Sequence, residues 1–162
     1  MSADLANQSC RNRNLFTGAT RKLRAFLSLS NQDRWLLLQA WWLLLGVDLG
    51  LRLLPFRRLQ SILANDASVA ATAQLADATA VIGRLYWLVR LAGRNHLYPM
   101  TCLRRALALQ RLLALHGVPT ELRFGVQKEN GNLTAHAWLE YQGLPIGEPE
   151  VLTGRYAPLA YQ

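Results

Sequence analysis

The chain has 162 residues, of which 51% are hydrophobic, and its formal net charge at pH 7 is +8. This length suits one domain with its own core and excludes two large domains, while the apolar fraction excludes a disordered chain. The positive charge predicts an acidic partner. Nucleic acid is a poor candidate, because aromatic residues do not interleave with the arginines and no helix-turn-helix or zinc-finger spacing occurs.

Residues 1–27 are predicted to form a basic N-terminal arm. Five basic residues stand there among small polar ones: Arg11, Arg13, Arg21, Lys22 and Arg24. The chain has only two cysteines, one of them (Cys10) in this arm. Two cysteines are too few for a disulfide framework, which predicts a reducing, cytoplasmic location. No cleavable signal peptide is predicted, since the first apolar run begins only at Trp35.

Residues 28–95 are predicted to form a helical region with three helices. The first follows a capping serine, Ser28 or Ser30. The second is the short segment that Pro55 opens, and the third ends at Gly93. This region and the segment after it are expected to form a single compact domain from about residue 28.

The first predicted helix, over about 31–54, contains the apolar run WLLLQAWWLLLGVDLGLRLL, which is long enough to cross a bilayer. Asp48 and Arg52 interrupt this run four residues apart on one helical face, where they can pair. We therefore expect a core helix that is buried on most sides. Peripheral membrane contact through tryptophans is the open alternative, and the candidates are Trp35, Trp41 and Trp42.

Residues 96–162 are predicted to form the functional core. A helix over about 102–116 ends at Gly117, and hydrophobic residues then alternate with polar ones. The strands TELRFGVQK, LTAHAWLEY and LPIG follow, separated by the turns Asn130-Gly131 and Gln142-Gly143. Helices followed by an antiparallel meander predict an α+β fold.

Cys102 opens the predicted 102–116 helix, directly after a possible capping residue, Thr101. The positive end of the helix dipole and the free backbone N–H groups favour a thiolate there. The same N–H groups, including that of Cys102 itself, can stabilise an oxyanion. A nucleophile is therefore one interpretation of Cys102, and buried packing is the other.

His136 lies in the middle of the LTAHAWLEY strand, on the face that Trp138 also occupies. An imidazole opposite the Cys102 thiol would complete a thiolate–imidazolium pair. We therefore predict catalytic roles for Cys102 and His136. Trp138 is a candidate for the substrate-binding wall, and His96, before the helix, is a candidate for a further oxyanion donor.

An acidic group should orient the imidazole. Glu140 lies about 13 Å along the strand from His136 and is too far. Glu148 and Glu150 return after the Gln142-Gly143 turn. A strict two-residue loop turns Glu148 away from the His136 face, whereas a longer loop or a bulge brings both glutamates onto it.

A metal site is the competing chemical interpretation. The cysteine and the three histidines in this part of the chain are Cys102, His96, His116 and His136. No two of them have ligand spacing, and neither CxxC nor HExxH occurs. We predict no metal and no cofactor.

The segment from Cys102 to Glu148, CLRRALALQRLLALHGVPTELRFGVQKENGNLTAHAWLEYQGLPIGE, resembles the lasso peptide biosynthesis B protein in its split form, a family of transglutaminase-like, papain-like cysteine peptidases. The similarity lies in the order of its parts: Cys-Leu opening a helix, a Gly-x-Pro break, a GVQK strand, then AHAWLE. Upstream, LLPFRRL (residues 53–59) is similar to the helical region of the family.

The resemblance implies a bacterial leader peptidase with a Cys-His-acid triad. Cys102 and His136 match the nucleophile and the histidine of the family, and Glu148 stands where the family has aspartate. The implied partners are the precursor leader peptide, a separate PqqD-like leader-recognition protein and an asparagine-synthetase-like lasso cyclase. An acyltransferase of the same fold, a non-catalytic scaffold between recognition protein and cyclase, and a membrane-associated helical protein are the alternatives.

Overall fold

The computed structural model describes residues 26–64, 78–129, 132–147 and 157–158. The chain divides into two compact units, Met1–Leu36 and Leu37–Gln162. The second unit contains most of the helices and the whole sheet, and the packing contacts below are within it. Most of the predicted basic arm lies outside the described residues. The domain boundaries at 27/28 and 95/96 stay predictions.

The first helix begins at a serine N-cap. In α2 (Asn31–Leu53), Ser30 Oγ accepts a hydrogen bond from the Asp33 backbone N–H at 3.0 Å and donates one to Asp33 Oδ2 at 2.7 Å. This reciprocal arrangement satisfies a backbone donor at the open end of the helix. Ser30, rather than Ser28, is therefore the cap, and α3 (Phe56–Ala64) follows Pro55 as predicted.

One face of α2 is buried and the opposite face is exposed. Ala40, Leu44 and Val47 are buried, whereas Trp42 keeps 63% of its surface exposed. Only 28% of the most apolar 18 residues of this helix are buried. The prediction of a helix buried on most sides is wrong, because the apolar run covers the outward face as well as the core face. The length and composition of α2 are those of a helix that could cross a membrane, but core helices of soluble proteins meet the same two criteria.

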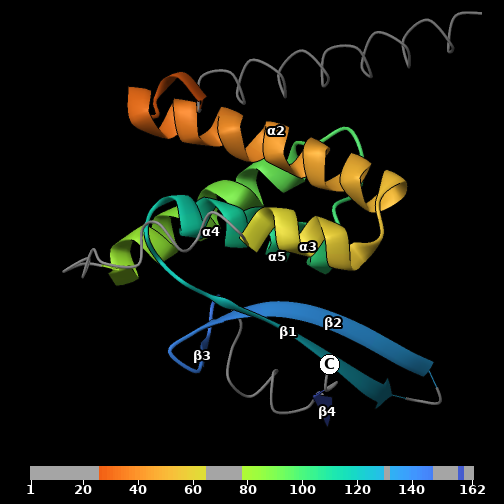
Figure 1. Ribbon diagram of the computed structural model, residues 1–162. Helices are drawn as coiled ribbons and strands as arrows, with labels where there is room; N and C mark the ends of the chain where they lie inside the picture. Colours follow the sequence, from red (N-terminus) through yellow and green to blue (C-terminus); the bar gives the residue numbers. More distant parts are fainter. Residues whose placement is uncertain (1–25, 65–77, 130–131, 148–156, 159–162) are drawn as a thin grey trace, which may run out of the picture. The chain divides into compact units, whose positions relative to one another are not determined.

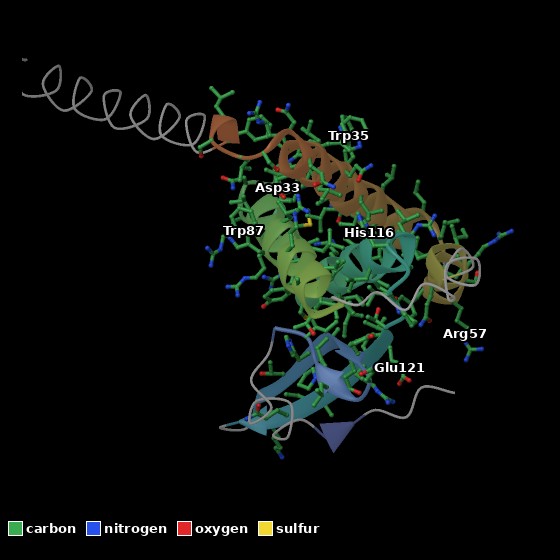
Figure 2. The ribbon with its side chains drawn as sticks, turned by 90° about the vertical axis from the view of Figure 1, so that its left-hand side faces the viewer. Asp33, Trp35, Arg57, Trp87, His116 and Glu121 are labelled. Atoms are coloured by element: carbon green, nitrogen blue, oxygen red, sulfur yellow. The ribbon has the colours of Figure 1, made fainter. Side chains whose placement is uncertain are left out.

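Two further helices complete the helical layer. They are α4 (Ala78–Arg94) and α5 (Cys102–Leu115), and α5 packs against α3, α4 and both long strands. Its central position explains why seven of its residues are buried: Ala106, Leu107, Ala108, Leu109, Leu112, Leu113 and Ala114. Figure 2 shows Trp87 on the outer side of α4, in agreement with its exposed fraction of 49%.

The end of α5 has the hydrogen bonds of a Schellman motif. The Val118 N–H donates to Leu113 O at 2.9 Å, and the Gly117 N–H donates to Ala114 O at 3.0 Å. Gly117 has a φ of 76°, which glycine adopts without steric cost. The predicted stop at Gly117 is confirmed, and it turns the chain from α5 into the sheet.

The sheet has the strand order β3-β2-β1-β4 and every pairing is antiparallel. The long strands are β1 (Glu121–Glu129) and β2 (Asn132–Tyr141), and the short ones are β3 (Leu144–Pro145) and β4 (Ala157–Pro158). Helices lie on one side of the sheet, as Figure 1 shows and the contacts of α5 with β1 and β2 require. The α+β prediction is confirmed, and β4 was not predicted.

The turn between β2 and β3 is a strict two-residue loop. Tyr141 pairs with Leu144 across Gln142 and Gly143, which have φ values of 52° and 79°. The ladder ends with the Ile146 N–H donating to Leu139 O at 2.8 Å. Gly147 follows with a φ of 70°, outside the strand conformation. The third predicted strand is therefore shorter than LPIG.

Candidate active site

Cys102 is the first residue of α5. Thr101 has extended φ and ψ values of −68° and 164°, and its side chain accepts a hydrogen bond from the Arg104 N–H at 3.4 Å. The first intrahelical bond runs from the Arg105 N–H to Thr101 O at 3.2 Å. The Cys102 N–H precedes that bond, so it belongs to the free donors at the positive end of the helix. The predicted position of the cysteine is confirmed.

The two sides of α5 at this end have different roles. Arg104 lies on the side opposite Cys102, and its Nη2 is 2.7 Å from Oδ1 of the buried Asp48 on α2. Asp48 also pairs with Arg52 at 3.0 Å, as the four-residue spacing predicts. The first turn of α5 is thus tied to α2 on one side, which leaves the Cys102 side free for the sheet.

His136 lies on β2 directly opposite Gly125 of β1. Since glycine has no side chain, the β1 position directly opposite His136 places no side chain beside the imidazole. The ring stacks with Trp138, with centroids 6.0 Å apart and planes 18° apart. Trp138 Nε1 donates to Glu140 Oε1 at 3.0 Å, so Glu140 holds Trp138 rather than the histidine.

Cys102 and His136 line one cavity. Its volume is about 60 Å³, and Trp138, Ala106 and Leu109 form part of its wall. Both predicted catalytic side chains are half-buried, so they are reachable and yet partly shielded from water. The wall of this cavity thus includes a residue with a thiol at a helix N-terminus and a residue with an imidazole on a strand, the two groups that nucleophilic catalysis by cysteine uses, and their catalytic pairing stays a prediction.

His96 does not line this cavity. Its ring packs against Trp41 of α2, with centroids 4.9 Å apart. Its Nδ1 accepts the Tyr98 N–H at 3.5 Å, and its Nε2 is buried without a hydrogen-bond partner among the described residues. This packing gives the predicted oxyanion role no support. Glu148 and Glu150 lie outside the described residues, so the third group of the triad stays a prediction.

Three polar residues of the cavity wall were not predicted. They are Tyr86 and Arg90 of α4 and Arg105 of α5. Arg105 follows Cys102 by three residues and lies about 60° around the helix from it, so a helical projection could have found it. The two α4 residues lack such a signal, because only the packing of α4 against α5 brings them to the cavity.

Tyr86 also fixes the chain just after β3. Its hydroxyl donates to Gly147 O at 2.9 Å, and its ring lies directly against the Gly147 Cα, where a Cβ would overlap it. Gly147 thus needs to be glycine for two reasons, its positive φ and this close approach. The contact positions the start of the segment that contains Glu148.

Gly147→Ala is expected to destabilise the fold more than Gly143→Ala. Both positions have a left-handed φ, 70° and 79°, but a Cβ at Gly143 meets no atom within 4 Å. The shared backbone term costs about 1 kcal/mol, and the overlap with Tyr86 should add about 1–3 kcal/mol. Urea unfolding of the two variants measures the difference. Equal losses, or no relief of the Gly147→Ala loss by Tyr86→Ala, would contradict the close contact.

No metal centre is evident in the part of the chain that the structure describes, where no three His, Cys, Asp or Glu side chains are grouped for a metal ion. Comparison with protein families gives a match of residues 41–161 to the transglutaminase-like superfamily. Comparisons with curated proteins and with solved structures give no match. The family match covers the cavity, both of its candidate catalytic residues and the helices that support them.

Proposed function

Because the chain belongs to the transglutaminase-like superfamily, whose members are typically cysteine-dependent enzymes, we propose that it is a cysteine peptidase that removes the leader from a ribosomally made lasso peptide precursor. The observation that carries the proposal is the shared cavity of Cys102 and His136. The superfamily suggests a cysteine peptidase or an acyltransferase. The sequence resemblance of residues 102–148 supports the peptidase and its substrate.

The proposed reaction begins with the Cys102 thiolate paired with protonated His136. The sulfur attacks the scissile carbonyl of the leader, and the Cys102 N–H at the open end of α5 donates to the resulting oxyanion. His136 gives its proton to the leaving amine as the C–N bond breaks, which leaves a thioester. His136 then takes a proton from water, the hydroxide releases the leader as a carboxylic acid, and the thiolate is restored.

Three further residues have proposed roles in this scheme. Trp138 stacks on His136 and lines the cavity, so it limits the movement of the imidazole and forms a wall for the substrate. Glu148 is proposed as the acid that orients His136, with Glu150 as the alternative. The two-residue loop would turn Glu148 away from the His136 face if the strand continued, but Gly147, with a φ of 70°, ends the strand conformation before residue 148. Glutamate has one methylene more than the aspartate of the family, so its carboxylate lies farther from the backbone. The Tyr86 hydroxyl holds the preceding residue, Gly147, through its carbonyl oxygen.

The proposed partners follow from the split form of the family. A separate leader-recognition protein would present the precursor, and an asparagine-synthetase-like cyclase would close the ring on the amine that cleavage frees. The net charge of +8 favours an acidic leader or an acidic docking face. We propose that this takes place in the cytoplasm.

The experiment that tests the function is reconstitution with a lasso peptide precursor and a leader-recognition protein. Mass spectrometry should find a leader that ends in a free carboxylate and a core peptide with a free amine. A leader that carries a new amide would instead assign an acyltransferase. Intact precursor after incubation with the wild-type chain, with the recognition protein present, would leave the scaffold interpretation.

A further inference from the structure

We propose that Arg90 and Arg105 bind a carboxylate of the substrate beside Cys102, so that the active site selects an acidic group next to the reacting bond. This inference rests on the proposed function only in that the carboxylate belongs to a peptide. It names a substrate class, which neither the family match nor the Cys102–His136 pair specifies.

The two arginines come from different helices to the same cavity. Arg105 lies one helical turn after Cys102 on α5, and Arg90 lies on α4, which packs against α5. Both are exposed, whereas Ala106 and Leu109 of the same wall are buried. The guanidinium groups therefore stand at the rim of the cavity, and the apolar residues stand deeper.

The charge of this rim is not neutralised by a carboxylate among the described residues. Arg90 Nη1 donates to Tyr86 Oη at 3.2 Å, and its guanidinium lies over the Tyr86 ring at 5.5 Å. Tyr86 is a neutral partner, so the charge of Arg90 is held in place and not cancelled. By contrast, Arg104 and Arg123 each form an ion pair with a carboxylate within 3.0 Å.

The size of the cavity limits what can enter it. Its volume is about 60 Å³ and it opens to solvent, which suits a short side chain better than a folded segment. A carboxylate is the anionic group that peptides carry, and arginine binds it through two parallel N–H···O bonds. The carboxylate has two sources in a peptide, an acidic side chain or a free C-terminus.

The test uses two small alkylating probes on the full-length chain. Iodoacetate and iodoacetamide both form an S–C bond with Cys102 and release iodide, but only iodoacetate is an anion. The ratio of their rates, followed by mass spectrometry of the Cys102 peptide, reports the charge at the rim and cancels changes in thiol reactivity. We expect a higher ratio than for glutathione, and a drop of about fivefold in Arg105→Gln, the effect of one nearby charge in water.

The matched control is Arg94→Gln, which removes the same charge from α4 one turn after Arg90 at an exposed position outside the cavity wall. Its ratio should equal that of the wild type, and Arg90→Gln should lower the ratio like Arg105→Gln. Equal ratios in the wild type and in both cavity variants would overturn the proposal. A drop of the same size in Arg94→Gln would also overturn it, because net charge alone would then explain the effect.

Protection against iodoacetamide identifies the source of the carboxylate. N-acetylglutamate amide carries a side-chain carboxylate, N-acetylglutamine carries a terminal one, and N-acetylglutamine amide carries neither. Protection of Cys102 by the first assigns an acidic side chain, and protection by the second assigns a free C-terminus. Protection by neither, or equal protection by the neutral amide, would overturn the proposal. The alkylation and protection measurements need no precursor. Their outcome is therefore independent of the cleavage assay, and failure of one proposal can be told apart from failure of the other.

Discussion

Replacing His136 with alanine is expected to slow cleavage of the precursor by about a thousandfold, the usual contribution of a general acid–base group. Among the described residues that line the cavity, His136 supplies the imidazole base, and the scheme uses it in both proton transfers. Cys102→Ala should leave the precursor uncut, because it removes the nucleophile of the scheme. Initial rates with the recognition protein present measure both effects, and circular dichroism checks that the variants fold.

Thr134→Ala is the control for the histidine variant. Thr134 lies two residues before His136 on the same strand face and is exposed, so its loss should leave the cleavage rate close to that of the wild type. Cleavage by His136→Ala at a rate within about tenfold of the wild type would contradict its role as the base. Full cleavage by Cys102→Ala would remove the catalytic assignment altogether.

Asp48→Ala is expected to cost about 3 kcal/mol of the free energy of unfolding, the lower end for breaking a buried ion pair. The Asp48 side chain is 5% exposed and contacts two arginines, of which Arg104 is 22% exposed. Removing the carboxylate leaves the Arg104 charge largely buried beside α2. The loss stays at the lower end because Arg104 keeps its hydrogen bond to Pro99 O at 3.3 Å and some contact with water.

Glu121→Ala provides the matched comparison. Glu121 forms an ion pair with Arg123 at 2.7 Å, and the side chains of the pair are 71% and 52% exposed. Such exposed pairs contribute about 1 kcal/mol or less. Urea unfolding of both variants at one pH gives the two losses. An Asp48→Ala loss no larger than that of Glu121→Ala would show that the buried pair does not hold α5 against α2.

The elements that follow local rules were predictable from the sequence. The Ser30 and Thr101 caps, Pro55 and Gly117 mark helix ends, and each acts through its nearest neighbours in the chain. The Gln142-Gly143 turn was likewise predictable, whereas its loop length was left open, and the structure has the two-residue loop. Residues that act within one turn leave a pattern that a single sequence displays.

The features that depend on packing between distant segments were not predictable. The two-residue strand β4 is too short to show an alternating pattern. The partner of Asp48 on α5 lies far along the chain, and only the local partner Arg52 was expected. The exposed second face of α2 was missed because composition alone does not distinguish a core helix from one with an apolar outer face.

The candidate site also has features that local sequence patterns predict and features that depend on packing. The position of Cys102 at a helix start and of His136 within a strand follows from local pattern. Their meeting at one cavity depends on α5 lying against β2, which the family resemblance implied and the periodicities did not. The arginines at the rim depend on the packing of α4 as well, and no motif marks them.

The proposed peptidase depends on the Cys102 thiol and the His136 imidazole acting as a pair, and the alkylation rate of Cys102 by iodoacetamide at neutral pH measures this. An isolated thiol is almost entirely protonated and slow to react under these conditions. If the two groups are paired, we expect rapid alkylation in the wild type and a rate at least about tenfold lower in His136→Ala. Equal rates in the two proteins, with Thr134→Ala also unchanged, would contradict it.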